Sequence, residues 1–333
     1  MINFKKSRAR AAIALGIASV SLFAACSASQ PSQFAARWLK VVTESTDEAN
    51  LGGKETAEYD VSFEPGVNTA FSVNYSNGKF RTELYADENK NYVYETSLTI
   101  DVSYSFGGES IAFDGENGDV VKSKAVFKNT KNGLAPVSSS KTVIAHVPSS
   151  ASPVALSGKN GCYSEYYYTI STDYSSNSCT ITYYKDKAAF DAGQVLDERK
   201  NNFEHDGKHS LIDNEELLPA LRAINESTTF SVYNTAAGKM QNVSVSKSGS
   251  EKTAFNFKIE GADEAAADHT LDYATYSVKI DDTNPGATQE FLVAATTDVG
   301  NNEYRNVILR MKTPLSFNLG TLVYNLSSVN FLK

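Results

Sequence analysis

Apolar and polar residues alternate over most of this chain, and this period of two is the feature that most restricts its fold. In "SLTIDVSYSF" (97–106), five apolar side chains fall on one side of an extended chain: Leu98, Ile100, Val102, Tyr104 and Phe106. Successive side chains of a β-strand point to opposite faces, so such a segment forms a strand with one apolar and one polar face. The chain is therefore predicted to consist mainly of antiparallel strands that bury one face.

The same alternation recurs from about residue 55 to the C-terminus, for example in "AEYDVSF", "SKTVIAHV", "YATYSVKIDD" and "GTLVYNLSSVNF". Asn77-Gly78 in "FSVNYSNGKFRTEL" predicts a hairpin turn, and Gly107-Gly108 predicts another. Long meandering strands favour a curved sheet over a compact sandwich. The expected fold class is mainly β: a large curved antiparallel sheet or open half-barrel with one or two covering helices.

Two segments break the alternation and are predicted to be helices. In "IDNEELLPALRAI", Asp213 and Glu216 have the spacing of a capping box. Near the N-terminus, Phe34 to Val42 has helical spacing behind a Ser32 cap. Strands before and after 213–224 indicate two halves of one sheet with that helix across the concave side. The apolar face of this helix is the candidate lining of a hydrophobic groove: Leu217, Leu218, Leu221 and Ile224.

The first 26 residues have the organisation of an export signal. Four basic residues within residues 1–10 precede an apolar run, 11–25, that is shorter than the roughly 20 residues needed to span a bilayer; a plain anchor helix is the alternative. The progression "LFAAC" (22–26) resembles the lipobox of bacterial lipoproteins, with Phe23 where leucine is usual. This resemblance implies cleavage before Cys26 and a diacylglyceryl thioether on its sulfur.

The expected organisation follows from that resemblance. Residues 1–25 are the signal peptide, 26–33 the lipidated cysteine with a short tether, and 34–333 a single β-rich domain. The protein is then anchored to the cell membrane through Cys26 on the extracytoplasmic side, or to the outer membrane if the cell has one. Two or more acyl chains give stable anchoring, whereas one chain gives only marginal binding.

The charge of the chain excludes one class of partner. The full sequence carries 31 Lys and Arg against 39 Asp and Glu, and removal of the four basic leader residues leaves 27 against 39. The formal net charge therefore moves from -8 to -12. An acidic protein with few basic clusters is a poor nucleic-acid binder and is repelled by anionic lipid, so acyl chains must hold it to the membrane.

The other two cysteines, Cys162 and Cys179, flank a predicted hairpin rich in tyrosine. An exported protein meets an oxidising environment, so a disulfide between them at the open ends of the hairpin is the natural interpretation. Alternation places Tyr166 and Tyr168 on one face and the neighbouring tyrosines on the other. A carbohydrate platform is the alternative to burial of this cluster.

Catalytic and metal-binding patterns are not found. His205 and His209 are four residues apart, but Gly207 between them favours a loop over a zinc-binding helix. The turns at 281–286 and 298–303 lack the spacing of a calcium loop. Hydrolase elbows, phosphate loops and dinucleotide fingerprints are also missing, so no enzyme activity, cofactor or metal is expected.

A second resemblance concerns three segments: "DNEELLPALR", "FSVYNTAAGKMQNVSV" and "TPLSFNLGTLVYNL". They are similar to bacterial envelope proteins of uncharacterised function with curved antiparallel sheets, and the plan resembles the half-barrel of lipoprotein carriers. The resemblance implies a non-enzymatic lipoprotein that holds a lipid or other hydrophobic ligand in a groove of the sheet. The alternative is a structural or adhesion module, including a carbohydrate-binding one, without a small-molecule site.

Overall fold

The computed structural model describes most of the chain from residue 53 onward. The described ranges are 41–43, 53–67, 72–106, 109–130, 133–148, 155–156, 159–160, 163–203, 212–234, 237–280, 288–294, 304–315 and 318–331. The expected signal peptide (1–25), Cys26 and the expected tether lie outside these ranges, as do Cys162 and the two histidines of 205–209. So do most of the helix expected at 34–42 and both acidic turns, so the expectations for them stay predictions.

Strands make up nearly all of the regular structure. They are β1 (Lys54–Pro65), β2 (Ser72–Ala86), β3 (Tyr92–Phe106), β4 (Glu109–Phe113), β5 (Asp119–Thr130), β6 (Gly133–Pro148), β7 (Ala155–Leu156), β8 (Lys159–Asn160), β9 (Tyr163–Asp173), β10 (Ser178–Tyr184), β11 (Val195–Asn202), β12 (Thr228–Asn234), β13 (Lys239–Ile259), β14 (Ala267–Ile280), β15 (Gln289–Ala294), β16 (Ile308–Pro314) and β17 (Gly320–Asn330). The helices are short: η2 (Gly115–Asn117), α2 (Lys187–Asp191), η3 (Asn214–Glu216) and α3 (Leu217–Leu221).

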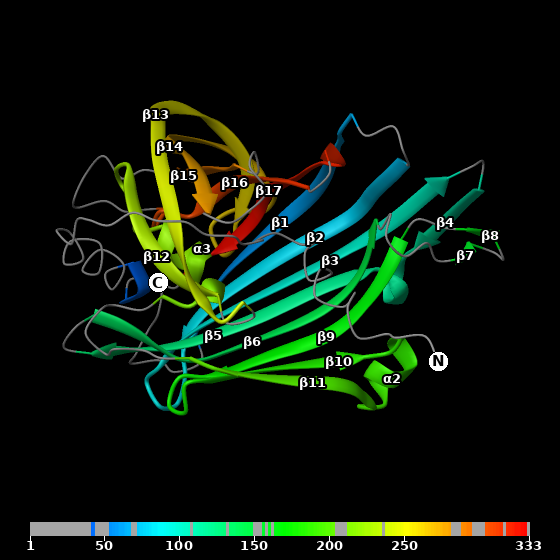
Figure 1. Ribbon diagram of the computed structural model, residues 1–333. Coiled ribbons are helices and arrows are strands. Elements are labelled where there is room, and N and C mark those ends of the chain that lie inside the picture. Colours follow the sequence, from blue (N-terminus) through cyan, green and yellow to red (C-terminus); the bar gives the residue numbers. More distant parts are fainter. Residues whose placement is uncertain are drawn as a thin grey trace.

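Fifteen of these strands form one sheet, in the order β11-β10-β9-β6-β5-β3-β2-β1-β17-β16-β15-β14-β13-β12, with β4 paired to β3. Neighbouring strands in this order are antiparallel. A short parallel contact of Lys258 and Ile259 with Ser328 and Val329 joins β13 to β17 and closes β13 to β17 into a ring. Figure 1 shows the ring strands curling over one end of a broad open half made of β1 to β6 and β9 to β11, while β7 and β8 form a separate two-stranded sheet. The predicted fold class is confirmed.

The main hydrophobic core lies inside the ring and along the inward face of β1, β2, β3 and β5. The alternating apolar residues of β3 from Leu98 to Tyr104 are all buried there, as predicted. Helix α3 is fastened into this core at its end: Tyr276 on β14 donates to the carbonyl of Ile224, and Asn306 donates to that of Arg222. The core therefore joins the ring, α3 and the first strands into one body.

The prediction of a hairpin turn at Asn77-Gly78 is wrong, because β2 runs through this dipeptide without turning. Ser76 pairs with Asp101 and Lys79 with Thr99, so Asn77 and Gly78 together form a bulge. Asn77 adopts a left-handed backbone with φ of 51°. A Cβ on Gly78 would lie 2.6 Å from Cβ of Val61. The dipeptide thus serves close packing against β1 rather than chain reversal. The second hairpin is confirmed, since β3 pairs with β4 from Phe106 and Glu109 onward.

The helix predicted over 213–224 is shorter than expected and begins as the 3-10 helix η3. Asp213 is its N-cap and accepts a hydrogen bond from the backbone of Glu215. Glu216 does not complete the capping box; its side chain is fully buried instead. Within the described ranges, none of the helices combines the length and apolar character needed to cross a membrane.

Candidate functional site: the inner wall of the open half

The far side of the open half, β6, β9 and β10, is lined differently from the main core. Tyr168 lies between Val143 on β6 and Tyr183 on β10, and the next inward position on β9, Ile170, pairs with Ile181. Tyr166, Tyr168 and Tyr183 are only partly buried, and they pack against two small apolar clusters separate from the main core. We call Val143, Tyr166, Tyr168, Ile170 and Tyr183 the inner wall.

The face on which the inner wall lies follows from strand register. Val143 and Lys141 on β6 share a face with Ser123 and Ala125 on β5, and Ala125 belongs to the main core. The wall therefore continues the concave, core-bearing side of the sheet. Tyr167 points to the opposite side and packs against Phe190 of α2, with ring centroids 6.4 Å apart. The predicted division of the tyrosine cluster between two faces is thus seen for Tyr166, Tyr167 and Tyr168.

The aromatic rings of the inner wall lie close together. The rings of Tyr168 and Tyr183 have centroids 6.0 Å apart. Burial raises the pKa of the Tyr168 phenol, and the nearby Lys141 offsets this only in part. The guanidinium carbon of Arg199 on β11 lies 5.3 Å from the centroid of the Tyr183 ring. The wall thus combines an apolar aromatic surface with one cation at its exposed edge.

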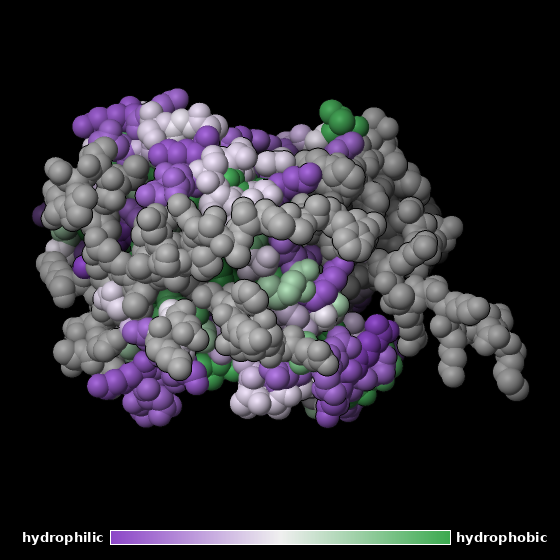
Figure 2. Space-filling model, turned by 60° about the vertical axis from the view of Figure 1, so that its left-hand side comes forward, coloured by the Kyte–Doolittle hydropathy of each residue, from purple (hydrophilic) through white to green (hydrophobic). Residues whose placement is uncertain are grey.

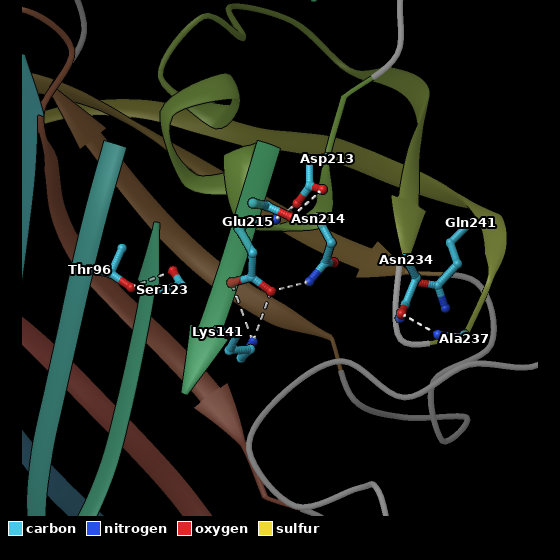
Figure 3. A network of polar contacts seen from close by, with 10 residues as sticks. Thr96, Ser123, Lys141, Asp213, Asn214, Glu215, Asn234, Ala237 and Gln241 are labelled. Atoms are coloured by element: carbon cyan, nitrogen blue, oxygen red, sulfur yellow. Dashed lines mark hydrogen bonds and ion pairs between the residues drawn. The ribbon is translucent and has the colours of Figure 1, made fainter. Parts of the chain in front are cut away.

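An ion pair marks the boundary between the inner wall and the helix. Lys141 points inward from β6 and its Nζ lies 3.1 Å from Oε1 of Glu215 on η3. Burial by itself lowers the pKa of Lys141, but Glu215 outweighs this effect and the pKa lies above its usual value. Figure 3 shows this pair, with Asn214 donating to the same carboxylate and the Thr96–Ser123 hydroxyl pair on the neighbouring strands. The pair holds η3 against β6.

A buried carboxyl pair lies directly behind this boundary. Asp213 accepts hydrogen bonds from Ser139 Oγ at 2.8 Å and from the phenol of Tyr174. Burial, reinforced by the charge of Glu215, raises the pKa of Asp213 to about 6. Burial and the charge of Asp213 raise the pKa of Glu216 well above its usual range. Among the described residues, neither carboxyl oxygen of Glu216 has a hydrogen-bond partner, so burial of its ionised form is costly.

The residues predicted to line a groove lie in the main core. Leu217, Leu221 and Ile224 are 4%, 2% and 4% exposed, and Leu218 packs against the same core while partly buried. These four side chains therefore pack against the main core. Their predicted role in lining a groove stays a prediction. The partly exposed aromatic surface lies instead on the sheet, at the inner wall.

The structure also changes the interpretation of the two later cysteines. Cys179 is buried on β10, and it pairs with Thr172 beside the turn of the hairpin, not at its open end as predicted. Tyr163, next in sequence to Cys162, pairs with Pro148 and lies nine residues from Thr172 along β9. At about 3.3 Å per residue this is about 30 Å, whereas a disulfide needs Cα atoms within about 7 Å. The bond itself stays a prediction, since Cys162 lies outside the described residues.

Sequence reasoning missed Lys141, although a signal for it exists. In "SKTVIAHV", Lys141 has the same parity as Val143 and Ala145, so alternation alone places a charged side chain on the apolar face. A lysine at such a position requires an acidic partner, because an isolated buried charge is costly. That partner, Glu215, could not be identified without the tertiary structure. Within the described residues, no group of three or more His, Cys, Asp or Glu side chains is arranged to hold a metal ion.

The chain was compared with protein families, curated proteins and solved structures. No protein-family model matches the sequence, and neither does any curated protein. Among solved structures, the chain is similar to the crystal structure of a beta-barrel-like protein of the domain of unknown function DUF1849 from Brucella abortus. The TM-score is 0.42 and the sequence identity 9%, over 85% of this chain and 100% of that chain.

Proposed function

We propose that this protein is a non-enzymatic extracytoplasmic lipoprotein whose inner wall binds one hydrophobic molecule that carries an acidic head group. The single observation that carries the proposal is the set of partly buried tyrosines on the concave face of β9 and β10. In the ring the inward side chains are packed into the main core. On β9 and β10 they form only small clusters with incompletely buried aromatic rings.

The chemistry of the wall fits an amphipathic ligand. The partly buried rings of Tyr168 and Tyr183, backed by the buried side chains of Val143 and Ile170, offer an apolar surface for an alkyl chain. Arg199 lies at the exposed edge of the same face, with its Nε 3.9 Å from Asp197 Oδ2, and its remaining guanidinium N–H groups can pair with a ligand carboxylate. Figure 2 shows one face of the molecule, on which the described surface is mostly hydrophilic and the hydrophobic colour is confined to small patches.

The test is a titration of the delipidated protein with dansyl-labelled undecanoic acid. Saturable binding of about one molecule per chain is expected. Tyr168→Asp should weaken binding at least tenfold, because it puts a charge in the apolar contact. Tyr168→Leu should retain most of the binding. The matched control is Thr169→Asp, on the same strand but with its side chain on the opposite face. Absence of saturable binding by a folded protein would favour the structural or adhesion module instead.

The membrane anchor is the second part of the proposal. The charged start, the apolar run and "LFAAC" support lipidation of Cys26, as in the lipoprotein family that they resemble. Metabolic labelling with an alkyne analogue of palmitate should label the wild-type protein, and Cys26→Ala should remove the label and release the protein from membranes. Equal labelling of both proteins would contradict the anchor and leave a soluble or helix-anchored protein.

A further inference from the structure

The outward face of the sheet, opposite the inner wall, carries a polar trough that runs across the neighbouring strands β2, β3, β5 and β6. Its volume is about 340 Å³, at the lower end of the range typical of small-molecule sites. Its lining includes small hydroxyl side chains on the outward face, those of Ser97, Ser140 and Thr142. Ser97 pairs with Lys122, and Lys122 pairs with Thr142, so the three strands contribute to one row across the sheet.

The walls of the trough are charged, but most of the charges are already paired. Glu83 lies 2.6 Å from Lys54 and 2.8 Å from Arg81, and Glu95 lies 2.8 Å from Lys124. Burial alone raises the pKa of Glu83 and Glu95, but their cationic partners outweigh it and hold both pKa values below the usual range. Both carboxylates are therefore ionised at neutral pH and keep acceptor capacity for a ligand's hydroxyl groups.

Lys122 is the exception among the charged groups of the trough. Its side chain is exposed, and it has no ion-pair partner among the described residues. Lys122 lies on β5, which also carries Lys124, and it is paired with Ser97 on one side and with Thr142 on the other. An unpaired ammonium beside free hydroxyl groups is suited to an anionic group on a hydroxyl-bearing molecule.

Apolar side chains border the trough on the same outward face. On one side are Tyr85, Val93 and Val126, which lie in one row across β2, β3 and β5. Val93 is almost fully buried although it points away from the core. On the other side Val120 pairs with Ile144. A pyranose ring has apolar C–H faces as well as hydroxyl edges, so polar groups between apolar borders match its two kinds of surface.

From this arrangement we infer that the trough is a binding site for a short acidic saccharide, with Lys122 holding the acid group. The hydroxyls of Ser97, Ser140 and Thr142 and the carboxylates of Glu83 and Glu95 bind the sugar hydroxyls. This site is separate from the inner wall, since the two lie on opposite faces of the sheet. Loss of either site therefore leaves the other unchanged.

The test is calorimetric titration of the full chain with trigalacturonic acid, with its methyl ester and with inorganic phosphate. Saturable 1:1 binding of the acid is expected, at least tenfold tighter than that of the ester or of phosphate. Lys122→Gln should weaken binding of the acid at least tenfold. Lys128→Gln, an exposed lysine on the same strand outside the trough, should change it less than twofold.

Each other outcome overturns a definite part of this inference. Equal binding of acid and ester would remove the role of the acid group. Phosphate binding as tight as that of the saccharide would show a simple anion site. No binding of any probe, or equal effects of the two lysine variants, would contradict the saccharide site altogether. Lys122 is exposed on the sheet surface, so its replacement should leave the circular dichroism spectrum unchanged.

Discussion

At the scale of single residues, Glu55 on β1 and Arg222 after α3 form an ion pair inside the protein. Their side chains are 4% and 7% exposed, and Arg222 Nη1 lies 2.5 Å from Glu55 Oε1. The second nitrogen of the guanidinium donates to the carbonyl of Arg305. Removal of one partner from a buried pair leaves an uncompensated charge, which costs far more than the pair contributes.

Glu55→Gln is therefore expected to lower the free energy of unfolding by about 3 kcal/mol, measured by urea denaturation. The matched control is Glu58→Gln on the same strand, whose exposed carboxylate lies 3.0 Å from Arg81. Loss of such a surface pair should cost less than about 1 kcal/mol. Similar losses in both variants would mean that the buried pair has no special role.

Gly78 is the second residue whose replacement should destabilise the protein, because it lies in the β2 bulge, close to atoms of the neighbouring strands. A Cβ would approach Val61 Cβ to 2.6 Å, the Val61 carbonyl oxygen to 2.8 Å and Ile100 Cδ1 to 2.9 Å. Gly78→Ala should destabilise the protein by about 2 kcal/mol through overpacking. Gly249→Ala in β13, where no atom lies within 4 Å of the added Cβ, is the control and should have little effect in the same denaturation experiment. A stable Gly78→Ala variant would show that the bulge can relax.

At the scale of elements, the attachment of η3 to the open half depends on protonation of Asp213. The pKa of this group is raised from 3.8 to about 6, so the folded state binds more protons than the unfolded state between these values. The stability contributed by the neutral carboxyl is then complete below pH 4 and lost as pH rises to about 6. Glu216 acts in the same direction, because burial and the charge of Asp213 raise its pKa as well.

The expected result is that wild-type stability relative to Asp213→Asn falls between pH 4 and pH 6. The size of the fall is on the order of 3 kcal/mol, from about 1.4 kcal/mol per pKa unit. Urea denaturation of both proteins across this range measures it. A constant difference between the two proteins from pH 4 to pH 7 would contradict the raised pKa of Asp213.

The elements also show how far sequence reasoning reached. The faces of β3 and β9 followed from alternation, because strand geometry is local. The Asn77-Gly78 error arose because a bulge and a turn use the same residues, and only the neighbouring strands decide between them. The capping box failed at Glu216 because tertiary burial overrode a local preference. Cys179 was misplaced because the hairpin turn lies directly before it.

At the scale of the whole molecule, the ring and the two faces of the open half could not be predicted. The parallel contact between β13 and β17 joins segments about 70 residues apart in sequence and has no local signal. The inner wall depends on the register of β6, β9 and β10, its boundary depends on Lys141 meeting Glu215, and the trough depends on four strands in register. What the sequence did predict was the class of fold, a large curved antiparallel sheet, because the pattern behind it is repeated in almost every strand.

The central claim is that a hydrophobic ligand lies on the inner wall, and photolabelling tests it most directly. The folded protein is irradiated with a diazirine-bearing fatty acid, and the labelled peptides are mapped by mass spectrometry. We predict that label concentrates on 163–184, the β9–β10 hairpin, and that excess unlabelled fatty acid or Tyr168→Asp removes it. Label that lies mainly on the ring strands 239–330, or that is spread evenly over the chain, would contradict the account.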